Sequence, residues 1–472
     1  MFKKILIANR GEIASRIIRA CKELDIPSVA IYSMEDRNSL FVKKADEAYL
    51  IGNGPLDGYL NIQQIVDLAI KVGADAIHPG YGFLSENPLL AETCEKRGIK
   101  FIGPKSEVIR TLGDKIQARK AAQEVGIPVV PGTDKPLETV EEAKEFASKY
   151  GYPVIIKAAA GGGGRGMRVV YKEEEIEESY NMAKSESSKA FNDDRVFIEK
   201  FVENPHHIEF QILADQYGNV IHLLERDCSI QRRNQKIIEI APSLILTNSQ
   251  REEMGKKSKD LASFVGYENT GTIEYLVDKD MNYYFMEMNT RIQVEHPVTE
   301  VVTGVDLIQQ QIMVAAGVPL PIKQEDISSR GYAIEIRINA EDPKNNFMPS
   351  IGQITKYYSP GGIGVRIDGT VYSGFKMSPY YDSMISKLIV CAPTWGEAVA
   401  RAKRALKEYT VTGVKTNIPF TQNIVKHPIF KTGNFDTSFI EKHPELMDYT
   451  EYRDPVETVL AIAAAIAAYE GI

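Results

Sequence analysis

The chain has 472 residues, enough for two or three packed units, and its hydrophobic fraction of 43% is typical of a soluble globular protein. Its 56 basic and 64 acidic residues are intermixed and give a net charge of −8, which argues against a surface built for nucleic acid. The longest apolar run, near 459–469, is too short to cross a bilayer, and the four widely spaced cysteines indicate neither disulfides nor a zinc ribbon. We therefore expect a cytoplasmic protein that binds neither nucleic acid nor membrane.

Strands and helices alternate over the first hundred residues. The pattern predicts strands at Lys4–Ala8, Ser28–Tyr32 and Ala76–His78, and helices at Glu12–Leu24 and Ile62–Val72. This βαβ order predicts a parallel sheet covered by helices, in which ligands lie beyond the carboxyl ends of the strands. The segment His78–Phe83 lies at such an end.

The pattern changes from about Leu112 to that of an α+β region with an antiparallel sheet. Strand-like runs occupy 154–158, 167–171, 196–202, 209–214, 272–278 and 283–288. A mixed region then runs from Gly331 to about residue 447. The tail begins with a helix-start pattern at Asp454–Glu457, and its apolar stripe is suited either to docking on another surface or to packing on its own chain (Val459, Ile462, Ile466 and Tyr469).

A glycine-rich segment, Gly161–Gly166, separates two of these strand-like runs. It contains a G-x-G-x-x-G match, but the strand-like 167–171 follows where a Rossmann fingerprint needs a helix. The Gly-Lys-Ser/Thr of a P-loop is absent. The segment therefore predicts a hairpin tip whose backbone N–H groups close over phosphates, with Arg165 adding charge. An ordinary flexible hairpin loop is the alternative interpretation.

Two acidic residues face each other in a predicted hairpin formed by 271–278 and 283–289. If Asp278 pairs with Tyr283, Glu274 pairs with Glu287, and their β-carbons are about 5 Å apart. Like charges directly opposite are destabilising, so a shared proton or a cation must offset them. Asn289 points to the same face because strand side chains alternate, and this oxygen-rich set suits Mg²⁺. A solvated face is the alternative.

Polar residues also alternate in the next segment, where Arg291, Gln293 and Glu295 offer a cation, an amide and a carboxylate on one face. The arginine fork suits a small planar anion such as bicarbonate, and Glu295 suits the base that deprotonates it. Upstream, Ser229–Lys236 concentrates three positive charges. A solvated basic loop is the simpler interpretation of that segment, but beside an acidic cluster it suits an anionic intermediate.

These residues resemble the biotin carboxylases, a family within the ATP-grasp superfamily, from Met1 to about Met447. The matching stretches are 8–14, 78–87, Lys157 with the glycine segment, 225–229, 287–297, 337–343 and 380–384. The resemblance implies an α/β and α+β fold with four parts. They are an N-terminal Rossmann-like domain (1–113), an ATP-grasp domain with a mobile lid at about 131–203 (114–330), a C-terminal mixed α+β domain (331–447) and a tail helix (448–472).

The resemblance also implies site residues, sorted by the ligand each would hold. The ATP-binding set is Lys115, Lys157, Gly162, Gly163, Gly164, Gly166, Glu199, Lys200, Val202, His207, Gln231, Asn234, Glu274 and Glu287. The metal set, for Mg²⁺ or Mn²⁺, is Glu274, Glu287 and Asn289. Bicarbonate would be held by Lys236, Arg291, Gln293, Val294 and Glu295, and biotin by Tyr81 and Arg337. The implied catalytic residues are Glu295, Arg291, Arg337 and Lys236.

The implied reaction has two stages. Glu295 deprotonates bicarbonate, which attacks the γ-phosphate of ATP to give carboxyphosphate. This intermediate breaks down to CO₂ and phosphate, the phosphate deprotonates biotin, and Arg337 stabilises the biotin enolate that captures CO₂. One departure is Asn234, where many relatives carry histidine, and we expect it to alter nucleotide affinity at most.

The resemblance implies partners as well. No Ala-Met-Lys-Met attachment site occurs, so biotin would be on a separate carrier protein, and the carboxyltransferase would also be another chain. A homodimer is implied, with Arg19, Glu23 and Arg366 as candidate interface residues. Two rival functions share many of these features: another ATP-grasp carboxylate–amine ligase, and a non-catalytic nucleotide-binding subunit. The 291–295 segment, Tyr81 and Arg337 favour a biotin carboxylase over another carboxylate–amine ligase. A non-catalytic subunit is disfavoured because the metal and base glutamates are all present (Glu274, Glu287 and Glu295).

Overall fold

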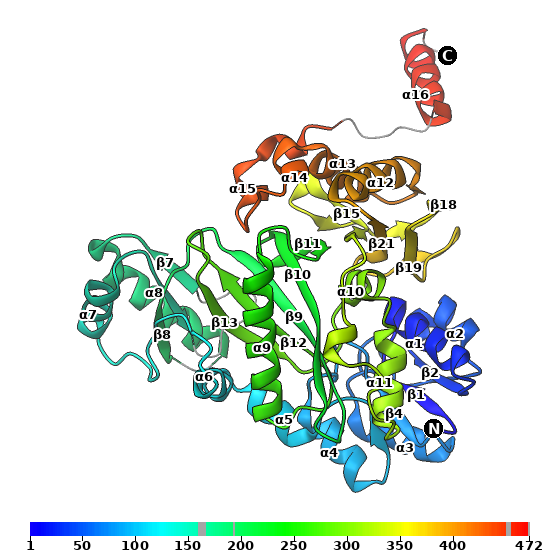
Figure 1. The fold of residues 1–472 in the computed structure, drawn as a ribbon. Helices are drawn as coiled ribbons and strands as arrows, with labels where there is room; N and C mark the ends of the chain where they lie inside the picture. Colours follow the sequence, from blue (N-terminus) through cyan, green and yellow to red (C-terminus); the bar gives the residue numbers. More distant parts are fainter. Residues whose placement is uncertain (159–166, 192–193, 450–454, 471–472) are drawn as a thin grey trace.

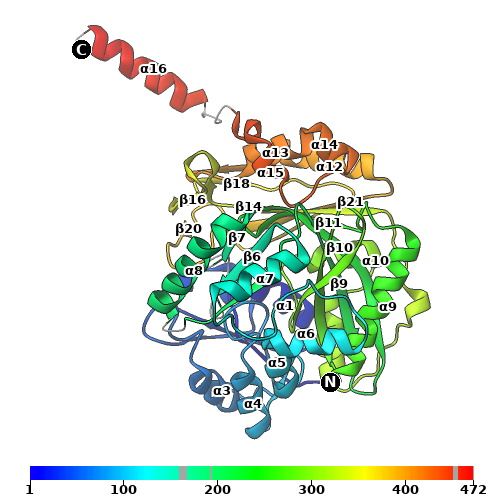
Figure 2. The ribbon, with the colours of Figure 1, turned by 90° about the vertical axis from the view of Figure 1, so that its left-hand side faces the viewer.

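The computed structural model describes residues 1–158, 167–191, 194–449 and 455–470 (Figure 1). Within these ranges, no helix is both long and apolar enough to span a bilayer. The predicted phosphate-binding glycines Gly162, Gly163, Gly164 and Gly166 lie outside the described residues, as does Arg165. The chain forms a compact body, with the region predicted as the lid (about 131–203) at one side and a terminal helix that extends away from it (Figures 1 and 2).

The N-terminal region is a five-stranded parallel sheet with the order β3-β2-β1-β4-β5, as the βαβ pattern predicts. Its strands are β1 (Ile5–Ile7), β2 (Ser28–Tyr32), β3 (Glu47–Leu50), β4 (Ala76–His78) and β5 (Lys100–Phe101). Helices α1 (Gly11–Glu23), α2 (Leu40–Lys44), α3 (Ile62–Lys71), α4 (Pro88–Lys96) and α5 (Ser106–Gly113) complete the region. The residues of β1 are fully buried because apolar side chains cover both faces of the sheet.

The lid has a small sheet of its own, ordered β7-β6-β8. Its strands are β6 (Val154–Ala158), β7 (Met167–Val170) and β8 (Val196–Lys200), and its helices are α7 (Val140–Tyr150) and α8 (Ile176–Phe191). The antiparallel pairing of Lys157 with Met167 confirms that the glycine segment joins the two strands of a hairpin. A separate apolar core, which includes Phe146 and Tyr180, holds the lid together. Helix α6 (Lys115–Glu124) leads into it.

The centre of the molecule is an eight-stranded sheet with the order β13-β12-β9-β10-β11-β14-β21-β19. The strands are β9 (His206–Ala214), β10 (Val220–Arg232), β11 (Gln235–Ala241), β12 (Asn269–Val277), β13 (Tyr283–Asn289), β14 (Tyr332–Asn339), β19 (Val365–Gly369) and β21 (Met384–Ala392). All neighbouring strands in it run antiparallel. Strands on both sides of the boundary predicted at residue 330 therefore share one continuous sheet.

Helices cover this sheet and close its apolar cores. Helix α9 (Asn248–Phe264) packs on β9 and β10, and helix α10 (His296–Thr303) lies against β11, β14 and β21. Helix α11 (Leu307–Ala315) contacts α1 of the N-terminal region. The C-terminal helices are α12 (Trp395–Glu408), α13 (Ile418–Lys426), α14 (Pro428–Thr432) and α15 (Phe439–Lys442). Together with β14 and β21 they enclose the largest apolar cluster, which reaches Tyr449.

The β12–β13 hairpin confirms the predicted pairing of Glu274 with Glu287. The pairing nearer the turn, however, differs from the prediction by one residue. Tyr283 pairs with Val277, so the predicted Asp278–Tyr283 pair is wrong by one residue. Met286 has no partner on β12, and this one-residue bulge restores the offset before the two glutamates meet. The bulge was not anticipated because the apolar runs on either side of it are uninterrupted.

The tail forms helix α16 (Pro455–Glu470), as predicted, and extends from the body (Figures 1 and 2). The four side chains of its predicted apolar stripe are exposed: Val459 by 63%, Ile462 by 55%, Ile466 by 56% and Tyr469 by 89%. The stripe therefore does not pack on the chain's own body. A helix that is apolar on most of its surface is ordinarily covered, so this finding favours docking over the alternative interpretation.

Candidate active site

Polar side chains gather on one face of the eight-stranded sheet, and strand alternation places them there. On β9, His207, Glu209 and Gln211 alternate with Ile208 and Phe210, whose side chains enter the apolar core on the other face. Glu209 pairs with Glu274 of β12 on one side and with Arg226 of β10 on the other. The result is a row of charged groups across four strands, completed by Glu287 of β13.

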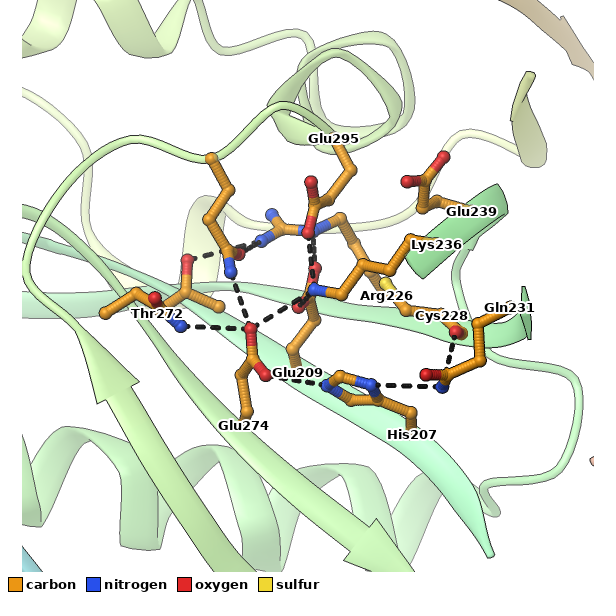
Figure 3. A network of polar contacts seen from close by, with 12 residues as sticks. His207, Glu209, Arg226, Cys228, Gln231, Lys236, Glu239, Thr272, Glu274 and Glu295 are labelled. Atoms are coloured by element: carbon orange, nitrogen blue, oxygen red, sulfur yellow. Dashed lines mark hydrogen bonds and ion pairs between the residues drawn. The ribbon is translucent and has the colours of Figure 1, made fainter. Parts of the chain in front are cut away.

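Arg226 is the fully buried centre of this network (Figure 3). Its Nε donates to Glu209 Oε1 at 2.5 Å, and Nη2 donates to Gln293 Oε1 at 2.6 Å. The remaining donors reach Gln211, Thr299 and Thr272 at 2.7, 3.0 and 3.2 Å. Because every arm of the guanidinium is occupied by protein groups, Arg226 holds strands and loop together and offers no free donor to a ligand.

Lys236, at the start of β11, joins three carboxylates (Figure 3). Its Nζ donates to Glu209 Oε2 and to Glu295 Oε1 at 2.6 Å each, and to Glu274 Oε1 at 3.1 Å. Burial opposes charge on Lys236, but the surrounding anions outweigh it and hold its pKa well above the usual range. The ammonium is therefore a fixed positive charge between Glu274 and Glu295.

Glu295 lies between Lys236 and Arg337. The Arg337 Nη2 donates to Glu295 Oε2 at 2.9 Å, so each oxygen of the carboxylate faces a different cation. Burial would raise the pKa of Glu295, but the charges of Lys236 and Arg337 lower it below its ordinary value. Glu295 is therefore ionised at neutral pH, the state that a general base needs.

The predicted strand-like alternation of Arg291, Gln293 and Glu295 takes another form in the structure. The segment 291–295 is irregular and leads into α10, and Glu295 is the N-cap residue of that helix. Gln293 does join the network, since its Nε2 donates to Glu274 Oε1 at 2.6 Å. Arg291 instead contacts Glu86 at 3.0 Å and donates to Asn289 Oδ1 at 3.0 Å. The carbonyl oxygen of Val294 accepts from Lys387 at 2.9 Å.

The two predicted metal-binding glutamates differ in their surroundings. Glu274 accepts from Asn289 Nδ2 at 2.9 Å and lies 2.8 Å from His207 Nε2. Burial opposes the charge of Glu274, but Lys236 and then His207 lower its pKa well below the usual range. Burial and then the charge of Glu274 raise the pKa of Glu287, while Lys115 at the start of α6 acts in the opposite direction. A divalent cation between the two carboxylates would remove their repulsion, so these residues fit a Mg²⁺ site.

The remaining predicted nucleotide residues lie around the lid and the β10–β11 turn. Lys157 contacts Glu199, which also accepts from Arg119 at 2.9 Å. The Nζ of Lys200 donates to the carbonyl oxygens of Gly151 and Tyr152 at 3.1 and 2.8 Å, and Val202 follows β8 half-buried. The side chains of Lys157 and Lys200 thus contact other residues of the predicted lid rather than a site on the central sheet.

His207 and Gln231 meet within the network, with 3.4 Å between His207 Nδ1 and Gln231 Nε2. Asn234 is exposed in the turn, where Arg233 and Asn234 have φ of 49° and 63°. This left-handed backbone is one that asparagine adopts readily, which gives the departure at position 234 a local reason.

The predicted biotin residues are joined through buried groups. Tyr81 donates to Glu12 Oε2 at 2.6 Å, and the same oxygen lies 3.1 Å from the fully buried Lys387. Lys387 in turn donates to Val294, next to Glu295. Burial and then Glu12 raise the pKa of Tyr81 well above its usual range, so its hydroxyl stays a donor. The two residues are close enough for the charge of Arg337 to oppose this rise in the pKa of Tyr81.

Several residues of the network were not predicted: Glu12, Glu209, Arg226, Glu239 and Lys387. A signal for one of them was present, because Glu209 alternates with apolar neighbours as a two-faced strand requires. Charged residues inside apolar strands, such as Arg226 and Lys387, carried a similar signal. The partners of these charged residues come from strands that are distant in sequence. A local pattern could therefore show that a charge is buried but not which residue it contacts.

Comparison with known proteins agrees with this geometry. The model for the biotin carboxylase N-terminal domain matches residues 1–109, and that for the biotin carboxylase C-terminal domain matches 335–442. Between them, 114–323 match the carbamoyl-phosphate synthase L chain ATP-binding domain. The biotin carboxylase of Nostoc sp. is 54% identical over 442 residues, covering 93% of this chain and 99% of that relative. The chain belongs to the biotin carboxylase family.

Further relatives come from multi-subunit carboxylases. The 2-oxoglutarate carboxylase small subunit of Hydrogenobacter thermophilus is 56% identical over 472 residues and matches all of both chains. A crystal structure of the biotin carboxylase domain dimer of that enzyme, with MgADP, ADP and bicarbonate, has a TM-score of 0.91 at 56% identity. It covers 96% of this chain and all of that one. As a family member, this chain is an ATP-dependent ligase that carboxylates biotin with ATP and bicarbonate.

Proposed function

We propose that the charged face of the central sheet carries out both steps of biotin carboxylation. The observation that supports this most directly is the position of Glu295, an ionised carboxylate held between Lys236 and Arg337. Lys236 donates to Glu295 and Glu274, Gln293 donates to Glu274, and Arg291 is near Gln293 in sequence. Bicarbonate would enter this cluster by replacing contacts between these groups.

In the first step Glu295 accepts the proton of bicarbonate, and the freed oxygen attacks the γ-phosphorus of ATP. The bond to ADP breaks and carboxyphosphate forms, while Lys236 and Arg291 balance its charge. Glu274, Glu287 and Asn289 would hold Mg²⁺, which neutralises charge on the phosphoryl group when it is bound. We propose that two lysines and the lid glycines enclose the phosphates of the nucleotide: Lys115, Lys157, Gly162, Gly163, Gly164 and Gly166. The rest of the nucleotide would be contacted by Glu199, Lys200, Val202, His207, Gln231 and Asn234.

In the second step carboxyphosphate breaks down to CO₂ and phosphate, and the phosphate removes the ureido proton of biotin. Arg337 lies beside Glu295, where the first step takes place, and from there its positive charge would balance the charge that develops on the ureido oxygen of biotin. Tyr81 is close enough to Arg337 to contact the same biotin. The deprotonated nitrogen then attacks CO₂. Exclusion of water by the lid would protect the labile intermediate.

The direct test is phosphate release from Mg-ATP by the purified chain, with and without bicarbonate and free biotin. We expect release to require bicarbonate and to rise with biotin. Release that ignores both compounds would contradict the proposal.

We propose that the biotin carrier and the carboxyltransferase are other polypeptides, as the names of several relatives as subunits suggest. A homodimer is proposed through the surface of α1 and β19. There Arg19 donates to Asp368 at 3.2 Å, Arg366 contacts the same residue at 2.6 Å, and Gln309 donates to Glu23 at 2.6 Å. Light scattering of the Arg19→Glu and Arg366→Glu variants tests it, and an unchanged mass in both would contradict it. The cytoplasmic location stays a prediction.

A further inference from the structure

Two fully buried carboxyl groups lie behind Arg337. Glu239 of β11 pairs directly with Glu335 of β14, so their side chains share one face of the sheet. Glu239 Oε1 accepts from Arg337 Nε at 2.6 Å. Its Oε2 is buried and accepts from none of the described residues, and the same is true of both oxygens of Glu335. Two like carboxyl groups are therefore opposed in the core with three oxygens unsatisfied.

The surroundings of these three carboxyl oxygens indicate that a proton on one carboxyl group is the simplest way to stabilise the pair. Helix α10 covers this face with Val298 and Val302, which pack against Ala241, Ala333 and Ile389. The charged groups nearest to Glu239 are Arg337 and Glu335 on β14, Lys236 on its own strand and Glu295 before α10. Strand β21 adds Lys387 beside Glu335, and β10 adds the Cys228 thiol, whose pKa the charge of Glu239 helps to raise. Two ionised carboxylates opposed in such a place would be costly, and a proton on one of them would remove the repulsion and supply a hydrogen-bond donor.

Burial acts differently on the two groups. It raises the pKa of Glu335 well above the usual range, with only partial compensation from Lys387. It raises the pKa of Glu239 to about 7 against the opposing charge of Arg337. Burial therefore favours the neutral form of Glu335, and Glu239, which accepts from Arg337, is the member of the pair better placed to carry a negative charge.

We propose that Glu239 is a positioning residue that keeps the Arg337 guanidinium in place after Glu295 has accepted a proton. Glu335 acts as its neutral partner and donates a hydrogen bond to the free Glu239 oxygen. The inference rests on the proposed function, because it concerns the moment between the two steps. In the free protein Arg337 bridges Glu295 and Glu239. Once Glu295 is neutral, its attraction for Arg337 falls, and Glu239 remains as the anion that holds the guanidinium.

A matched pair of substitutions tests this. Glu239→Gln removes the charge but keeps the shape, so we expect kcat/KM for biotin to fall about 10- to 100-fold, the range of a lost charge-assisted hydrogen bond. Bicarbonate-dependent ATP cleavage without biotin should change less than about threefold, since Glu239 does not touch Glu295. Glu335→Gln imitates the protonated acid and should stay within about threefold of the unaltered chain in both assays. Glu239→Asp, which restores the charge on a shorter side chain, should recover part of the loss in kcat/KM for biotin.

The pH profile of the unaltered chain supplies a second readout that needs no substitution. Glu239 holds Arg337 only when ionised, so the rate of biotin carboxylation relative to ATP cleavage should rise with pH through about 7. In Glu239→Gln this ratio should be flat. A flat ratio in the unaltered chain, equal losses in both assays, or a Glu335→Gln variant as impaired as Glu239→Gln would each overturn the inference. An unaltered chain without bicarbonate-dependent ATP cleavage would instead overturn the proposed function itself.

Discussion

Glu274 and Glu287 pair directly across β12 and β13, yet of these two glutamates only Glu274 contacts Lys236 and His207 among the described residues. Lys236 and then His207 lower the pKa of Glu274 against the effect of its burial, whereas burial and the charge of Glu274 raise the pKa of Glu287. The pair is therefore asymmetric without a metal. A divalent cation bound between the two would favour the ionised form of both, so metal binding should release part of a proton near Glu287.

The first prediction concerns that pair. Glu287→Gln should lower Mg-ATP turnover by at least about 100-fold, because the metal site loses a charged ligand. Phosphate release measured over a range of Mg²⁺ concentrations checks this, with Glu252→Gln on the exposed surface of α9 as the control. Turnover close to that of the control would refute the metal assignment.

The second prediction concerns stability. Lys236→Met leaves Glu209, Glu274 and Glu295 without their shared cation, which should cost about 3–5 kcal/mol of unfolding free energy at neutral pH. In the unaltered chain the lowered pKa values of Glu274 and Glu295 give stability that is present above their unfolded values and lost as pH falls.

Without the lysine, burial raises those pKa values instead, so the deficit of the variant should shrink as pH falls. Urea unfolding at pH 8 and pH 5 measures it, and Lys256→Met on the exposed side of α9 is the control. A deficit of equal size at both pH values would contradict this account.

The third prediction separates the two steps. Arg337→Ala should reduce biotin carboxylation by about 100-fold or more and reduce bicarbonate-dependent ATP cleavage by a smaller factor. The reason is that Arg337 donates to Glu295 but is proposed to act mainly on biotin in the second step. Both rates are measured on one preparation, beside Arg404→Ala on the surface of α12. Losses of equal size in the two assays would count against a specific role toward biotin.

The fourth prediction concerns the tail. A chain that ends at Tyr449 keeps the contact from Lys344 Nζ to the Tyr449 carbonyl oxygen, 2.6 Å long, and the packing of that ring. Because the apolar stripe of α16 is exposed, removal of 450–472 should leave ATP cleavage and free-biotin carboxylation within about twofold. It should also reduce binding of a hydrophobic dye. A large loss of activity would show that the tail serves the active site.

Much of the fold could be predicted because its local patterns are strong. The βαβ alternation gave β1, β2 and β4 within one residue at each end, and the acidic hairpin gave the Glu274–Glu287 pair. The buried network could not be predicted in the same way. Lys236, Glu295 and Arg337 are brought together by strand pairings and a loop that are distant in sequence, and their contacts depend on that register.

The bulge at Met286 has a consequence for the way this hairpin tolerates changes of length. Phe285 enters the apolar core and Glu287 faces the charged network, although residues two apart in a regular strand share a face. Deletion of Met286, which is 43% exposed, would make Phe285 and Glu287 neighbours that alternate without a bulge. Deletion of Phe285 would also remove the bulge, but it would place the smaller Met286 side chain in the core position of Phe285. Only the loss of Met286 keeps the phenylalanine in the core, so deletion scanning would reveal the register directly.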